Sequence, residues 1–191
     1  AAPSSSYNFK YVVDRNGVTS VSVGFESSDT TGSSWVFVPK FSSWSRTVTV
    51  GSITQSQTVE TSQVVNEDYY FYQAFTFSYK SAGGSFRMSV QFSFSTGALI
   101  IEPRGMFFSP QIGFESDSTG KAEVVFPTGY SVQQAIASGQ QSYSPTQTTA
   151  NSVLFNLQEN IMRLQIEFST DVSTPAITTI NQPPFSFKAV K

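Results

Sequence analysis

The chain has 191 residues, a formal net charge of −2, and neither cysteine nor histidine. These absences exclude thiolate nucleophiles, disulfides, Ser-His-Asp triads, and zinc or haem sites that use imidazole or thiolate ligands. Only 11 Lys and Arg residues are present, so we expect no nucleic-acid partner. Aromatic residues make up 15% and charged residues 13% of the chain, a balance typical of a folded, β-rich protein outside the cytoplasm.

The amino-terminal sequence Ala1-Ala2-Pro3 is typical of a mature terminus left after signal-peptide removal, although a trimmed sequence would begin in the same way. No apolar stretch approaches the length of a membrane span. We therefore expect an extracellular or cell-surface location without a membrane span.

The first predicted element is a β-hairpin. Alternating apolar residues precede the turn dipeptide Asn16-Gly17 and follow it up to Phe25, and Asn-Gly between such runs is a strong hairpin signal. The first strand needs an apolar groove for one face, which its own chain or a neighbouring subunit can supply. We predict that this strand pairs with the next subunit, with the segment 184–190 as the second choice. The contact residues would be Tyr7, Phe9, Tyr11 and Val13.

Two more hairpins are predicted from alternation with period two. Residues 69–79 and 86–94 would pair across the glycine-containing linker 80–85. Residues 152–157 and 162–168 would pair across 158–160. Further strands are expected at 34–38, 47–54, 57–65, 98–102, 121–126, 176–180 and 185–190.

One short helix is predicted near 131–138, with Ser131 as its N-cap and Gly139 just past its end. Residues 139–151 follow as a polar loop. The fold class is therefore all-β, an antiparallel β-sandwich of the jelly-roll or immunoglobulin-like kind.

An internal repeat supports a single domain over 1–191 built from two related β-units, about 1–105 and 106–191. The segment Gly24–Gly32 recurs as Gly113–Gly120, and each copy is followed after seven residues by a proline. There are two alternatives. The two hydroxyl-rich turns could be similar by chance, or the chain could consist of two small tandem domains.

Candidate chemistry is sparse. Residues 115–120 carry oxygens at alternate positions like the start of a calcium loop, but Phe126 stands where an EF-hand places its closing Glu. Glu67 and Asp68 would point to opposite faces of a strand and cannot form a glycosidase pair. We expect no enzymatic activity, metal or cofactor. Rings that could stack on surface glycans are Trp35, Trp44, Tyr70 and Tyr72.

The stretch 102–114 (EPRGMFFSPQIGF), together with Phe185-Ser186-Phe187, resembles extracytoplasmic β-domains of archaeal surface proteins. One kind is the β-sandwich subunit of threads and bundling pili, which polymerise by donor-strand exchange. The other is the β-domain that precedes a gluzincin-type metallopeptidase module, whose His-Glu-x-x-His motif this chain lacks. The resemblance implies a non-catalytic homopolymer subunit of a pilus-like filament. The alternatives are an accessory domain of a secreted metallopeptidase and a carbohydrate-binding or adhesion module.

Overall fold

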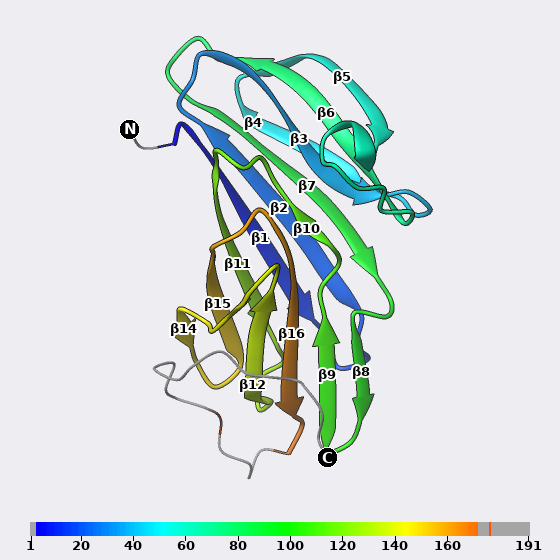
Figure 1. Cartoon of the computed structure of the whole chain (residues 1–191). Coiled ribbons are helices and arrows are strands. Elements are labelled where there is room, and N and C mark those ends of the chain that lie inside the picture. Colours follow the sequence, from blue (N-terminus) through cyan, green and yellow to red (C-terminus); the bar gives the residue numbers. More distant parts are fainter. Residues whose placement is uncertain (1–2, 172–175, 177–191) are drawn as a thin grey trace. The chain divides into compact units, whose positions relative to one another are not determined.

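A computed structural model describes residues 3–171 and residue 176. It is all-β, with mostly antiparallel strand pairs in three sheets, and its one helical element in the described residues is the 3-10 turn η1, Thr61–Gln63. The all-β prediction is confirmed. The strands (Figure 1) are β1 Ser5–Val13, β2 Thr19–Ser27, β3 Thr31–Pro39, β4 Ser45–Val50, β5 Ser52–Glu60, β6 Tyr72–Lys80, β7 Phe86–Phe94, β8 Ala98–Ile101, β9 Arg104–Phe108, β10 Ile112–Gly113, β11 Thr119–Val125, β12 Ser131–Ser138, β13 Ser142–Tyr143, β14 Gln147–Thr148, β15 Ser152–Leu157 and β16 Ile161–Ser169.

The chain divides into two compact units, each assembled from separate segments. The first unit holds the described residues up to Phe9 together with Val21–Ser93 and Gly113–Gly120. The second holds Lys10–Ser20, Phe94–Ile112 and the described residues from Lys121 onward. This division differs from the boundary near residue 105 that we expected from the repeat, so the duplication itself stays a prediction.

The first unit is a sandwich with an aromatic core. One layer has the strand order β1–β2–β7–β4, and the other has the order β3–β6–β5. Phe25 of β2 lies 5.3 Å from Phe77 of β6, and Tyr79 of β6 stacks on Phe86 of β7 at 4.4 Å between ring centroids. Burial of these rings supplies the main stabilising free energy of the unit.

The second unit also has two layers, and β1 contributes residues to both units. Its layers have the orders β14–β15–β11–β1 and β13–β12–β16–β9–β8, with β10 paired to β16. Phe126 contacts Phe168 at 4.5 Å and Phe107 at 6.1 Å between centroids. All three rings are buried, so they form the core of this unit.

The first predicted hairpin is confirmed, since β1 and β2 are neighbours in one sheet. Its turn is organised by Asp14, whose carboxylate accepts hydrogen bonds from the N–H groups of Asn16 (2.8 Å) and Val18 (3.0 Å). Gly17 takes φ +83°, a conformation that side chains with a Cβ atom rarely adopt.

The other two predicted hairpins are wrong, although their strands exist. β6 pairs with β3 and β5, whereas β7 pairs with β2 and β4. Likewise β15 pairs with β14 and β11, whereas β16 pairs with β12 and β9. In both places the linker crosses from one sheet to the other. Alternation shows that one face of a strand is buried, but it does not show which strand lies alongside.

The predicted helix near 131–138 is also wrong, because these residues form β12. Val132, Ala135 and Ile136 have helical spacing, but a bulge between Val132 and Gln134 shifts the strand's phase and accounts for that spacing. Isolated helices as short as eight residues are unstable in water. As a strand, the segment pairs with β16 over most of its length and is largely buried.

Three smaller differences concern turns and termini. The expected strand 47–54 is broken at Gly51, φ +87°, into β4 and β5, which belong to different sheets. The two acidic repeat segments each link strands of different sheets instead of closing a hairpin. Apart from Ala176, the predicted strands 176–180 and 185–190 and the second-choice donor segment 184–190 lie outside the described residues.

Among the residues described, no helix is long and apolar enough to cross a membrane.

Candidate functional site

The strand predicted to contact a neighbouring subunit lies inside the sheet of its own chain. β1 has β2 on one side and β11 on the other. The four side chains predicted to enter a neighbour's groove are all buried by their own chain: Tyr7, Phe9, Tyr11 and Val13.

The four aromatic residues proposed for sugar stacking have different environments. Trp35 is buried and stacks on Phe37 at 5.1 Å, and Tyr72 stacks on the same ring at 6.3 Å. Trp44 is half-buried, with its centroid 5.0 Å from that of Phe75. Tyr70 is the most exposed of the four, with 64% of its surface accessible to solvent.

Tyr70 belongs to a cluster that we call the aromatic tip, made of Phe41, Tyr70 and Phe71. Phe41 is 63% and Phe71 66% exposed. The three centroid separations are 5.2 Å for Tyr70–Phe71, 5.4 Å for Phe41–Tyr70 and 6.4 Å for Phe41–Phe71. Large apolar side chains exposed together in this way often mark a contact surface.

The pairing of β3 with β6 explains why these residues meet. Pro39, the last residue of β3, lies opposite Tyr72, the first residue of β6. The N–H of Lys40 then donates to the carbonyl of Phe71 at 3.0 Å. Consequently the two segments lie side by side where β3 ends and β6 begins (Figure 1).

Lys40 lies beside the aromatic tip and is held there by a carboxylate. Its Nζ lies 5.9 Å from the ring centroid of Phe41 and 5.8 Å from that of Tyr70. The same ammonium donates to Glu60 at 3.0 Å (Oε1) and 3.3 Å (Oε2). The ammonium of Lys40 therefore lies near two rings of the tip while Glu60 compensates its charge.

A tightly bonded loop carries Tyr70 and Phe71. The buried hydroxyl of Thr61 accepts from the N–H of Tyr69 at 2.7 Å and donates to the carbonyl of Glu67 at 3.1 Å. A small apolar cluster lies beneath the loop and packs on one face of β3 and β6. Its members are Trp35, Phe37 and Ala74, with Val59, Val64, Val65 and Tyr69 packed against them.

The border of the aromatic tip is acidic. Glu67 and Asp68 immediately precede the aromatic run and are exposed. The carboxylate of Glu67 accepts from the hydroxyl of Tyr69 at 2.9 Å, which fixes it beside the tip. An anionic partner surface would therefore meet like charge here.

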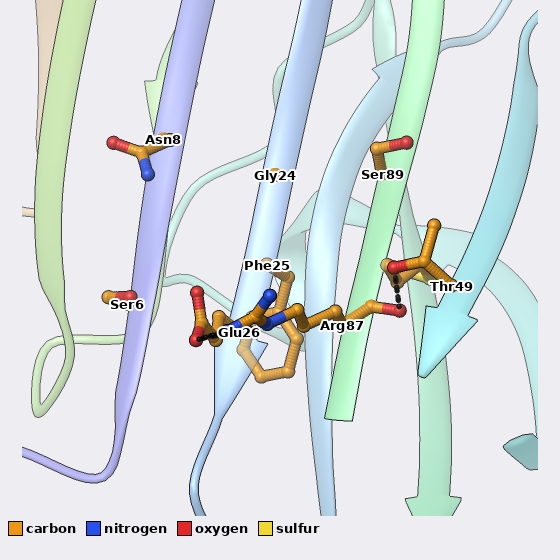
Figure 2. A pocket seen from close by; sticks show the side chains of 9 residues that line it. Ser6, Asn8, Gly24, Phe25, Glu26, Thr49, Arg87 and Ser89 are labelled. Carbon is orange, nitrogen blue, oxygen red and sulfur yellow. Dashed lines mark hydrogen bonds and ion pairs between the residues drawn. The ribbon is translucent and has the colours of Figure 1, made fainter. Parts of the chain in front are cut away.

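A separate shallow hollow lies on the outer face of β1, β2, β7 and β4 (Figure 2). Glu26 and Arg87 form an ion pair of 3.1 Å across it, and Thr49 donates to the Arg87 carbonyl at 3.3 Å. Gly24 leaves the floor open, and Phe25, the aromatic lining residue, is buried. This hollow offers polar and charged groups and no exposed ring for stacking on a sugar.

Two ionisable side chains with shifted pKa values lie near the start of β1. Burial raises the pKa of Tyr7 far above its ordinary value, and its hydroxyl bonds to Ser34 Oγ and to the carbonyl of Trp35. Burial, and after it the charge of Asp117, raises the pKa of Glu115, while a hydrogen bond with Ser34 opposes the shift. Both side chains are thus held at the edge of the core by hydrogen bonds within their own chain.

The described residues contain no group of three potential metal ligands.

Sequence reasoning missed part of the aromatic tip. Phe41 was not singled out, although a single aromatic residue between Lys40 and the polar pair Ser42-Ser43 is a signal of an exposed ring. Tyr70 and Phe71 were assigned to a strand that in fact begins at Tyr72. What unites the three rings is a strand pairing that no local pattern reveals.

Comparison with solved structures finds similarity over most of the chain to M1 zinc metallopeptidase structures. The M1 zinc metallopeptidase from Deinococcus radiodurans is 14% identical with a TM-score of 0.38, and 84% of this chain covers 41% of it. A candidate protease from Parabacteroides distasonis is 12% identical with a TM-score of 0.42, and 88% of this chain covers 41% of it. The chain thus spans well under half the length of each. No protein-family model and no curated protein sequence matches the chain.

Proposed function

We propose that this chain is a non-catalytic β-domain whose role is attachment, with the aromatic tip as its contact surface. The observation that carries the proposal is the grouping of three rings, each 63–66% exposed, within 6.4 Å of one another. Exposing them costs hydrophobic free energy that burial would recover, so contact with another molecule is favourable. The low charge and hydroxyl-rich composition favour a location outside the cytoplasm.

Lack of catalysis is part of the proposal. The chain has no histidine or cysteine, and Glu115 and Tyr7 are held by neighbours of their own chain. Assays with generic esterase, glycosidase and peptidase substrates should give background rates. A turnover number near about 10 per second, typical of enzymes, would contradict the proposal.

The accessory-domain form of the proposal assigns the attachment to a metallopeptidase. In that form a separate catalytic module supplies the zinc ligands. This module is either another molecule to which the domain attaches or another part of a longer polypeptide that contains the domain. Detection of the domain in its native source at a mass well above 20.9 kDa, together with zinc-dependent peptidase activity, would support this form.

The filament form of the proposal, in which copies of the chain attach to one another, stays a prediction. Negative-stain microscopy of natively purified protein tests it.

Site-specific photocrosslinking tests the attachment role directly. A benzophenone amino acid in place of Phe71 should form one defined covalent product, with protein or with lipid, in the native setting. The matched control places the same amino acid at Val12, which is exposed on β1 in the second unit. Equal products from both positions, or none from position 71, would show that the tip is not a contact surface.

A further inference from the structure

We infer that the aromatic tip docks on a lipid bilayer, inserting its rings into the interface of a membrane that carries little negative charge. The inference rests on the proposed attachment function and names the partner of the same site. Three properties of the tip support it: the size of its apolar surface, the orientation of its rings and the charge around it.

The apolar surface of the tip is small for a protein partner. An aromatic side chain presents roughly 200 Å², and about two thirds of each ring is exposed, so the tip offers on the order of 400 Å². A standard protein interface takes about 800 Å² from each partner. A bilayer needs no complementary shape, and its binding strength grows with whatever apolar area is inserted.

The ring orientations also favour a bilayer over a sugar. The planes of Phe41 and Tyr70 are inclined by 43°, those of Phe41 and Phe71 by 76°, and those of Tyr70 and Phe71 by 84°. A flat stacking platform for a sugar chain needs ring faces that share a plane, and these three rings do not share one. Rings inclined to one another fill the disordered boundary between headgroups and acyl chains equally well, and tyrosine is enriched at that boundary.

The charges around the tip select the kind of lipid. Lys40 lies beside two of the rings and can extend its ammonium towards headgroups, while Glu60 compensates its charge. Glu67 and Asp68 add exposed negative charge at the border. Anionic headgroups attract polybasic surfaces, so this acidic border should weaken binding to phosphatidylserine and leave zwitterionic phosphatidylcholine favoured.

Vesicle flotation with the full 191-residue chain tests the inference. The wild-type protein should float with phosphatidylcholine vesicles, and adding phosphatidylserine should lower the bound fraction. The double substitution Phe41→Ser with Phe71→Ser should reduce partitioning by roughly tenfold or more. Phe108→Ser, at a half-exposed ring in the second unit, should leave partitioning unchanged. Circular dichroism of each variant checks that it is folded.

A second readout locates the inserted residues. Phe71→Trp fluorescence should be quenched by lipids brominated near the headgroup, in excess of the quenching seen for the wild-type tryptophans. No flotation, equal loss with Phe108→Ser, or stronger binding to anionic vesicles would overturn the inference. If flotation fails while photocrosslinking from position 71 still captures a defined protein, the attachment function stands and the lipid partner is wrong. If both fail, the proposed function falls with the inference.

Discussion

The hydroxyl of Thr61 accepts a 2.7 Å hydrogen bond from the N–H of Tyr69, eight residues further along the chain. The same oxygen donates to the carbonyl of Glu67, and the side chain is fully buried. One threonine thus closes the loop that presents Tyr70 and Phe71. The aromatic tip is held in place before any partner arrives, which lowers the entropic cost of binding.

Replacing Thr61 with valine tests this arrangement. Thr61→Val keeps the shape but leaves the N–H of Tyr69 and the carbonyl of Glu67 without this partner, at a cost of about 1–3 kcal/mol in the free energy of unfolding. Urea unfolding measures the loss, and hydrogen exchange should rise across residues 64–71. Thr61→Ser retains the hydroxyl and serves as the control. If the two variants are equally stable and equally protected, the hydroxyl does not organise the loop.

Gly17 should tolerate no side chain. At φ +83° a residue with a Cβ atom is strained by roughly 1–2 kcal/mol, and the added Cβ would collide with the carbonyl oxygen of Ala98. Gly17→Ala should therefore lower the midpoint of thermal unfolding measured by circular dichroism. Gly83→Ala is the matched control, because nothing lies within 4 Å of a Cβ there. A Gly17→Ala protein as stable as this control would show that the turn readily relaxes.

Glu115 should destabilise the protein as pH rises. Its pKa is raised in the folded state, chiefly by burial, so its contribution to stability is fully present below the unfolded pKa of about 4.3 and is lost as pH rises through the folded pKa. Glu115→Gln should consequently be more stable than wild type at pH 7 and lose this advantage near pH 4. Denaturant unfolding at both values measures the difference. A constant difference between the proteins at the two pH values would contradict the assigned shift.

Glu159 should show the opposite pH dependence. Burial opposes its charge, but the N–H groups of Gln141 (3.0 Å) and Gln140 (2.7 Å) and the side chain of Tyr143 bond to the carboxylate and lower its pKa overall. A lowered pKa contributes stability above the unfolded value, and this contribution disappears as pH falls through the folded pKa. Glu159→Gln should be less stable than wild type at pH 7, with the gap closing towards pH 3. A gap that widens on acidification would refute the assignment.

The candidate site was only partly predictable from the sequence. The run of four aromatic residues at 69–72 pointed to Tyr70 as a candidate for sugar stacking, and Tyr70 is exposed in the structure. The other candidates included Trp35 and Tyr72, which pack on Phe37 beneath the tip. Whether an aromatic ring in such a run is covered depends on the loop 61–69 folding over the sheet, which is a contact between segments that share no local pattern.

The sequence by itself determined the fold class, most strand positions and the first hairpin. These features depend on period-two burial and on the chemistry of the Asn16-Gly17 turn, both of which act within a few residues. Beyond the first hairpin, the tertiary structure decided which strands are neighbours. The linkers 80–85 and 158–160 have lengths that suit a hairpin, yet each crosses from one layer to the other. A strand with one apolar face can bury that face equally well in either layer, so its pairing partners depend on the packing of the whole chain. The same packing decides that residues 131–138 form β12 and that Phe41 meets Tyr70.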